Sequence, residues 1–309
     1  MIGFACKFCD DDKQKVNDLN IKTTTQKFLR ANDPYQKIKT LLNHNYFSTL
    51  NLLKYVSSLP KDLKMVRLSS DLLPFYTHNE FKNIYQKEDI NNLTKTFLNH
   101  IGRFSRKHNI KLSFHPGQFT ALSSHRIDVI QSSISECNYH AFMCLNMGFK
   151  TFNDIKINVH ISGKNGADGF KETLKKIPQE TKNFMTVENT ENKYNLDAIL
   201  ELSDELPIVF DIHHEFCNSG KYIERKDKRI FKVIKSWKGF KPSMHLSNSR
   251  GNKNKNELRG HSDFIYNEDS KKIMFDYLND FDIMVEAKKK NLASIKFYND
   301  MKGISNENS

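Results

Sequence analysis

Short runs of β-branched and other apolar residues recur along the chain, and most of them end on or next to a polar residue. Each run is followed by a loop, and most loops lead into a segment where apolar residues return every three or four positions. The first pattern is typical of a buried strand and the second of an amphipathic helix. The strand-like runs lie at 2–6, 65–69, 111–115, 156–160, 184–188, 207–211, 243–246 and 282–286.

The segments between these runs predict helices. They lie at 36–58, 90–107, 127–147, 170–177, 196–202, 230–237 and 273–278. Strands that alternate with helices lie parallel in one sheet. Eight such units predict an α/β fold, a closed (β/α)8 TIM barrel, because closure leaves no exposed sheet edge. A doubly wound open sheet is the alternative, but no G-x-G-x-x-G motif follows the first run.

The length of 309 residues fits one such barrel. We therefore expect a single TIM-barrel domain over residues 1–309, with a short polar C-terminal tail from about residue 300. No apolar run reaches the ~20 residues of a membrane span, and no secretory signal opens the chain. We expect an intracellular monomer, in the cytoplasm or the nucleus, that does not bind membranes.

The net charge is +12, which favours a polyanionic partner, and nucleic acid is the commonest one. Richness in Lys and Asn could also reflect an AT-rich genome, so charge alone leaves both interpretations open. The five cysteines are an odd number and indicate a reducing compartment. Cys6 and Cys9 form one C-x-x-C motif, but no second pair follows, and a structural zinc site is not favoured.

Candidate catalytic residues lie where the predicted strands end, which is the face that carries the active site of a TIM barrel. The nine candidates are His78, His115, His160, Glu188, Asp211, His214, His245, His261 and Glu286. A single histidine in such a place is usually structural. Carboxylates that converge on one mouth, however, repel one another unless cations lie among them. The convergence therefore predicts a metal centre.

A mixture of imidazoles and carboxylates suits Mn²⁺, Zn²⁺ or Fe²⁺ better than Mg²⁺ or Ca²⁺. Nine ligands exceed the needs of one ion, so we expect two or three ions. Such clusters commonly hydrolyse phosphate esters. The residues that we expect to be catalytic are Glu188, Asp211, His245 and Glu286. No phosphate-binding loop or nucleophile elbow is present, so a metal-activated water is the expected nucleophile.

Two segments on the same face suggest DNA as the substrate. A Pro116-Gly117 turn places Gln118 and Phe119 beside His115, where an amide and an aromatic ring could wedge into stacked bases. The alternative is that Phe119 packs beneath its loop. The segment 248–261 is basic, and its Arg250, Lys253 and Lys255 could hold phosphates. The alternative there is a solvated loop without a ligand.

Eight sequence segments, in order along the chain, carry a family resemblance. They are 67–74, 115–119, 159–164, 187–189, 210–214, 245–247, 261–264 and 284–288. The H-P-G-Q-aromatic turn, the D-x-H-H segment and the V-E-A-K segment form a specific combination. The sequence resembles the UV damage endonucleases, which are TIM-barrel repair enzymes related in fold to endonuclease IV.

This resemblance implies cleavage of damaged double-stranded DNA on the 5′ side of UV photoproducts, and some members also act at abasic sites. It implies a cluster of divalent ions, usually manganese and in some cases zinc, with the nine residues above as ligands. Gln118 and Phe119 would probe the lesion from within the duplex. Phe4 matches a position where the family often carries Tyr, which implies a supporting role in stacking.

The sequence departs from the family at two positions. Ser243 stands where the family usually has a Lys that can be carboxylated to bridge metals, so we expect a water or hydroxide there instead. Phe119 stands where Tyr is common, which retains stacking but removes a phenolic hydrogen bond.

Two other functions compete with cleavage of damaged DNA. A sugar isomerase or epimerase of the same superfamily would need a closed pocket without a basic rim, and a non-catalytic DNA-binding barrel would need to have lost its metals.

Overall fold

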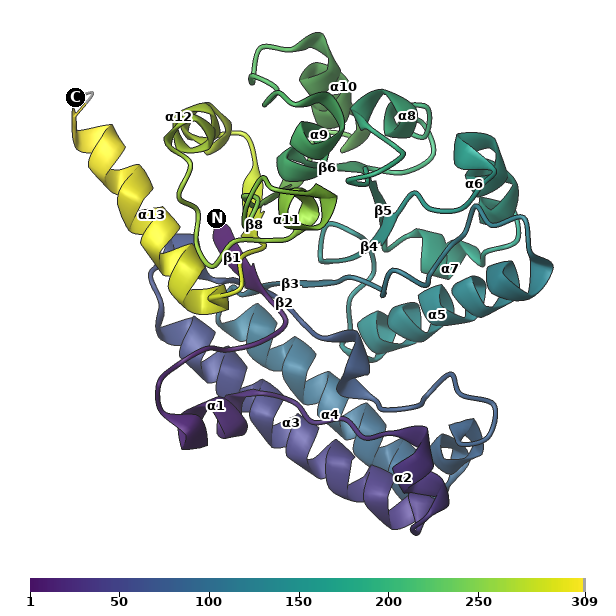
Figure 1. The fold of residues 1–309 in the computed structure, drawn as a ribbon. Coiled ribbons are helices and arrows are strands. Elements are labelled where there is room, and N and C mark those ends of the chain that lie inside the picture. Colours follow the sequence, from purple (N-terminus) through teal and green to yellow (C-terminus); the bar gives the residue numbers. More distant parts are fainter. Residues whose placement is uncertain (308–309) are drawn as a thin grey trace.

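Eight parallel strands close into a barrel in chain order, with β8 paired to β1 (Figure 1). The computed structural model describes residues 1–307. The strands are β1 (Ile2–Ala5), β2 (Met65–Arg67), β3 (Lys111–Phe114), β4 (Ile155–His160), β5 (Met185–Glu188), β6 (Ile208–Asp211), β7 (Ser243–Leu246) and β8 (Asp282–Val285). Each predicted run is a strand, with bounds within two residues of the expected ones. The TIM-barrel prediction is confirmed.

Helices surround the barrel and cover the outer face of its strands. They are α1 (Lys13–Leu19), α2 (Gln26–Arg30), α3 (Pro34–Ser58), α4 (Glu88–Lys107), α5 (Ile127–Asn146), α6 (Gly166–Leu174), α7 (Gln179–Lys182), α8 (Leu196–Leu200), α9 (Ile212–Ser219), α10 (Lys228–Ser236), α11 (Lys255–Arg259), α12 (Glu268–Tyr277) and α13 (Lys290–Glu307). Short 3-10 helices lie at Lys61–Leu63, Ser70–Leu72 and Lys82–Gln86. Helix α13 includes the segment from about residue 300 up to Glu307.

Alternation along the strands separates the core from the barrel interior. On β4, Ile155, Ile157 and Val159 belong to the main apolar core between strands and helices. Because successive side chains of a strand point to opposite faces, Asn158 and His160 point inward. The inward set therefore ends on reactive side chains at the carboxyl-terminal mouth of the barrel.

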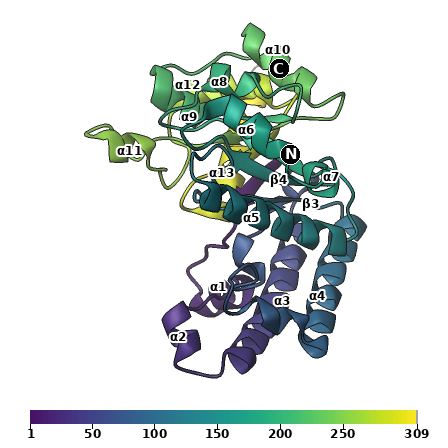
Figure 2. The same ribbon diagram turned by 90° about the vertical axis from the view of Figure 1, so that its right-hand side faces the viewer.

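Two parts of the chain extend from the barrel. In Figure 2, helices α1 to α4 form a packed group at the bottom of the view, and α11 projects sideways from the upper part as an arm. Within residues 1–307, no helix combines the length and the apolar content needed to cross a membrane.

Candidate metal centre

Seven of the nine predicted ligands converge at the mouth of the barrel. Their ligand atoms form three overlapping groups, and within each group these atoms all lie within 4.8 Å of one another. The groups are His115, Glu188 and His245; His160, Glu188 and His214; and Asp211, His245 and Glu286. Six of these side chains come from the ends of strands β3 to β8, and His214 comes from the first turn of α9. The tertiary structure thus brings together residues up to 171 positions apart, from 115 to 286.

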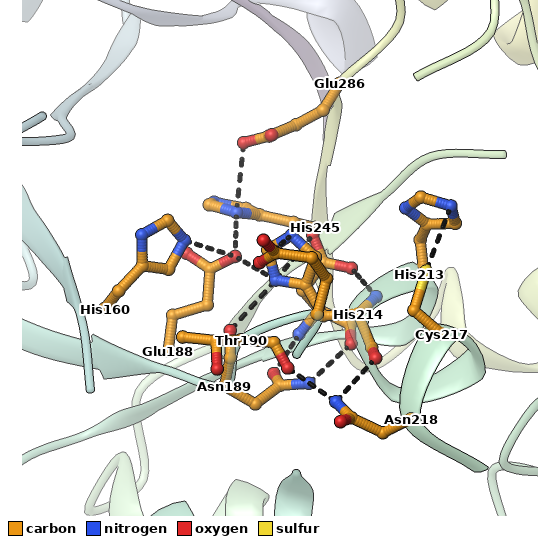
Figure 3. Close-up of polar contacts among 12 residues, drawn as sticks. His160, Glu188, Asn189, Thr190, His213, His214, Cys217, Asn218, His245 and Glu286 are labelled. Atoms are coloured by element: carbon orange, nitrogen blue, oxygen red, sulfur yellow. Dashed lines mark hydrogen bonds and ion pairs between the residues drawn. The ribbon is translucent and has the colours of Figure 1, made fainter. Parts of the chain in front are cut away.

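Glu188 lies at the centre of this cluster and is fully buried. Its Oε2 lies 3.0 Å from Nε2 of His115, and its Oε1 lies 3.0 Å from Nδ1 of His245. The nearest ring nitrogens of His214 and His160 lie 3.5 and 3.7 Å from Oε1. Figure 3 shows Glu188 between His160 and His245, with Glu286 directed at the same cluster. A carboxylate with these neighbours would hold a divalent cation together with the imidazoles.

The carboxylate of Glu188 is also held by polar side chains deeper in the barrel. The side-chain amide of Asn158 donates a hydrogen bond to Oε2 of Glu188. The hydroxyl of Thr186 donates in turn to Oδ1 of Asn158 at 2.9 Å. All three side chains are buried, so their hydrogen bonds are shielded from water. This chain orients Glu188 in the way that outer partners orient metal ligands.

Glu286 forms the second half of the mouth. Its carboxylate forms an ion pair with Arg67, and Nδ1 of His245 lies 3.2 Å from its Oε1. Nδ1 of His261 donates a hydrogen bond to the backbone carbonyl of Glu286 and lies 3.9 Å from its Oε2. Burial alone would raise the pKa of Glu286, but Arg67 and His245 hold that pKa well below its usual value. Glu286 is therefore ionised.

The imidazoles differ in their affinity for protons. Burial, together with His160, lowers the pKa of His115 to about 4. Burial also opposes protonation of His214, but Asp211 and Glu188 outweigh it and raise the pKa of His214 to about 9. Divalent ions would have to displace the proton from such a ring, because metals bind the neutral imidazole.

One carboxylate oxygen of Asp211 accepts no hydrogen bond within residues 1–307. Its Oδ1 accepts a hydrogen bond from the backbone N–H of His214 at 2.8 Å and caps α9. Its Oδ2 is buried and has no hydrogen-bond partner among the described residues, and Nδ1 of His214 lies 3.7 Å from it. A buried carboxylate oxygen without a hydrogen bond is costly, and a cation bound to it would remove that cost. The donor set and this free oxygen fit a centre of divalent ions.

The two remaining predicted ligands lie outside the three groups. His261 borders Glu286, as described above. Nδ1 of His78 accepts a hydrogen bond from the backbone N–H of Glu80 at 3.2 Å, and its ring stacks on Phe81. The structure therefore does not bring His78 to the cluster, and a role for His78 as a ligand remains a prediction.

The predicted lesion-binding aromatics differ in exposure. Phe119 is 86% exposed on the turn that follows His115, so the alternative that it packs beneath its loop is wrong. Gln118 beside it is also exposed. Phe4, in contrast, is 1% exposed and lies in the main core. The alternation along β1 points Phe4 outward against the helices, which contradicts the expected stacking role.

The predicted phosphate-binding residues lie on the projecting segment around α11. Arg250, Lys253 and Lys255 are all exposed there, and Figure 2 shows α11 projecting from the barrel. Ser249 and His261 form an isolated antiparallel bridge at the base of the segment. The segment therefore presents its cations to solvent on the face of the barrel that carries the metal centre.

Sequence reasoning missed three polar residues of the site, namely Arg67, Asn158 and His213. Arg67 and Asn158 lie at inward positions of β2 and β4, and the alternation of those runs could have identified them. His213 gives no such signal, because α9 was not predicted. Ser243, the departure from the family, has a buried hydroxyl without a hydrogen-bond partner within residues 1–307. It lines a small internal cavity together with Arg67.

The whole chain, residues 1–309, matches the family described as UV-endonuclease UvdE. A UV DNA damage endonuclease of Bacillus mycoides is 28% identical over 293 residues, covering 91% of this chain and 88% of that protein. SacUVDE has the same fold with a TM-score of 0.79, at 23% identity over 98% of each chain. Endonuclease IV from Thermus thermophilus also shares the fold, with a TM-score of 0.55 at 10% identity over 99% of each chain. The match over its full length shows that the chain belongs to the UV-endonuclease UvdE family.

Proposed function

We propose that this protein is a metal-dependent DNA repair endonuclease that hydrolyses the phosphodiester 5′ to UV photoproducts in double-stranded DNA, and also acts at abasic sites. The observation that carries the proposal is the convergence of Glu188, Asp211 and Glu286 with four imidazoles at one barrel mouth. Membership of the UvdE family supports damaged DNA as the substrate. Both observations are independent of the net charge.

The centre holds two or three divalent ions, with manganese preferred and zinc as the alternative. The ligands are the seven clustered residues, with His261 beside them and His78 on its loop. Such ions supply a hydroxide nucleophile at neutral pH and neutralise charge at phosphorus. Glu188, Asp211, His245 and Glu286 act at the reacting centre. Glu188 belongs to two of the three ligand groups and would hold an ion with the imidazoles of each.

The protein places its own groups around this centre. Arg67 orients Glu286, and Asn158 orients Glu188. Gln118 and Phe119 stand exposed on the rim, where they can enter the base stack at a lesion. Arg250, Lys253 and Lys255 contact backbone phosphates, which gives affinity without sequence preference.

The cavity beside Ser243 supports a water in place of the bridging group that the family usually carries there. The volume of this cavity is about 10 Å³, which is close to the cavity volume that one water molecule needs. Ser243 Oγ and Arg67 Nε are both buried without a partner in the part of the chain that the structure describes. A single water could satisfy both atoms.

A sugar isomerase or epimerase shares the barrel, so the fold does not separate the two functions. Family membership and the exposed rim do separate them. A polyol enzyme has no use for an exposed Phe119 or for a projecting basic segment. These observations favour the nuclease.

A nicking assay on a duplex with one defined pyrimidine dimer tests the proposal. The wild type should cut 5′ to the dimer in Mn²⁺ and not in EDTA, and Glu286→Gln should abolish cutting. Glu172→Gln is the matched control, since Glu172 is exposed on α6, away from the mouth. Full activity in Glu286→Gln would contradict the assignment of that ligand. Equal cutting of an undamaged duplex would contradict the repair function.

A further inference from the structure

The basic segment 249–261, called the basic arm below, is tied to the barrel at its base. The backbone N–H of Arg250 donates to the carbonyl of Gly260 at 2.7 Å, beside the bridge between Ser249 and His261. Between these ends the arm carries α11 and four cations against one carboxylate, Glu257. Its tip projects from the barrel in Figure 2. The orientation of the arm therefore depends on contacts near its base.

His213 makes the principal side-chain contact to that base. It is fully buried in the first turn of α9. Its Nε2 lies 3.1 Å from the hydroxyl of Ser249 and 3.1 Å from the carbonyl of Leu258, which are at opposite ends of the arm. Cys217, one turn later on α9, lies 3.5 Å from the same carbonyl. Helix α9 thus contacts the arm at Ser249 and at Leu258.

The direction of this hydrogen bond follows from elementary chemistry. A carbonyl oxygen can only accept, so Nε2 of His213 carries the proton and donates to Leu258. The same Nε2 of His213 lies within hydrogen-bond distance of the Ser249 hydroxyl, so one ring nitrogen makes both of these contacts to the arm. Its Nδ1 has no partner among residues 1–307. Figure 3 shows His213 beside the cluster, with one ring nitrogen turned toward Cys217.

His213 is also placed between two proposed metal ligands. Asp211 caps α9 and His214 follows His213 directly, so both belong to the same helical turn. Ions bound by Asp211 and His214 would fix that turn and thereby the direction of the N–H of His213. At the other end of the arm, His261 donates to the backbone of Glu286, another proposed ligand. Both ends of the arm are therefore anchored on elements of the metal centre.

We propose that His213 is a positioning residue that fixes the basic arm relative to the metal centre, so that binding of metal ions and binding of DNA phosphates reinforce each other. This inference rests on the proposed function of the centre and of the arm. Linkage of this kind is reciprocal, because each ligand stabilises the same arrangement of α9 and the arm. His213 itself touches neither the ions nor the DNA.

Binding of an undamaged duplex, measured by fluorescence anisotropy, tests the linkage without requiring cleavage. Mn²⁺ should tighten binding by the wild type about fivefold or more, the usual scale of such coupling. His213→Gln retains a donor near the position of Nε2 and should keep the effect. His213→Asn cannot reach Leu258 and should lose it. In nicking assays His213→Asn should raise KM and leave kcat unchanged.

Metal content and thermal unfolding of each variant complete the test. His140→Asn is the matched control, because His140 is equally buried but both its nitrogens bond to Glu136 and Ser70, away from the arm. If His213→Asn does not fold, Ser249→Ala removes one arm contact from the other side and should weaken the linkage partially. Loss of metal from both His213 variants would make His213 a ligand and overturn the proposal. Absence of any Mn²⁺ effect in the wild type would overturn it as well. Absence of nicking by the wild type would contradict the proposed nuclease function, and this outcome is distinct from loss of the linkage between metal and DNA binding.

Discussion

Carboxylates are buried at both ends of the barrel interior, but their charge partners differ between the two ends. At the floor, Asp282 accepts from the N-terminal ammonium at 2.9 Å and pairs with Lys111. At the mouth, Arg67 pairs with Glu286, and the other partners of the three carboxylates among the described residues are imidazoles, the amide of Asn158 and the backbone N–H of His214. At the floor, cationic groups of the protein neutralise the carboxylate, which is typical of a structural ion pair. At the mouth, imidazole lone pairs and carboxylate charges are available to bound cations, which is typical of a metal site.

The largest expected effect comes from Glu188→Gln, which removes the carboxylate shared by two of the ligand groups. Nicking should fall roughly 10³-fold, the scale for losing a major electrostatic group at a reacting centre. Metal content, measured by plasma mass spectrometry, should fall with it. The fold should persist, since one repelling charge has been removed from the mouth. Retention of full metal content would contradict the central position of Glu188.

The opposite outcome is expected at the floor. Asp282→Asn leaves the ammonium and Lys111 without their shared carboxylate, and should lower the free energy of unfolding by about 3 kcal/mol. Metal content and the metal requirement for nicking should not change. Denaturant unfolding at pH 7 measures the first effect. A loss of metal in this variant would contradict the division between floor and mouth.

This floor contribution should also depend on pH. Burial opposes ionisation of Asp282, but the N-terminal ammonium and Lys111 outweigh it and hold its pKa below the usual value. A carboxyl whose pKa is lowered by folding stabilises the fold at pH values above its unfolded pKa of about 4. This stabilisation is lost as the pH falls through the pKa of the folded state. The difference in unfolding free energy between wild type and Asp282→Asn should therefore shrink from pH 7 toward pH 3. A constant difference would show that charge is not the cause.

A smaller effect is expected from Asn158→Ala, which removes the amide that orients Glu188 from below. Loss of such an outer partner should weaken metal affinity by about 10- to 100-fold. Titration with Mn²⁺ measures the change, and excess Mn²⁺ should restore much of the nicking. Asn153→Ala, at an exposed loop position, is the control. An unchanged affinity would show that the imidazoles alone orient Glu188.

The smallest effect is expected on the basic arm, where Lys253→Ala removes one exposed cation. The slope of log Kd against log salt should decrease by about 0.9 if one phosphate contact is lost. Metal content and the position of the cut should not change. Asn252→Ala, next to it on the arm, controls for the substitution itself. An unchanged slope would remove Lys253 from the DNA interface and leave the metal centre unaffected.

Much of the barrel was predictable because its signals are local. Each strand shows a short apolar run, and period-two alternation marks the side that points inward. Helix α9 was missed, because Asp211 both ends β6 and caps the helix, so no loop separates the two elements. His213 was hidden with it. The same alternation applied to β1 would have placed Phe4 outward, since a shift of one residue reverses the face.

The sequence by itself determined the barrel, the chemical types of the ligands and the positions of the strand ends, because periodicity and residue chemistry are encoded locally. Only the tertiary structure decided which of those residues meet. It brought Arg67 from β2 to Glu286 after β8, centred the cluster on Glu188 and set His78 apart. It also placed His213 under the basic arm. These contacts depend on closure of the barrel and on the packing of its loops, which join residues far apart in the chain.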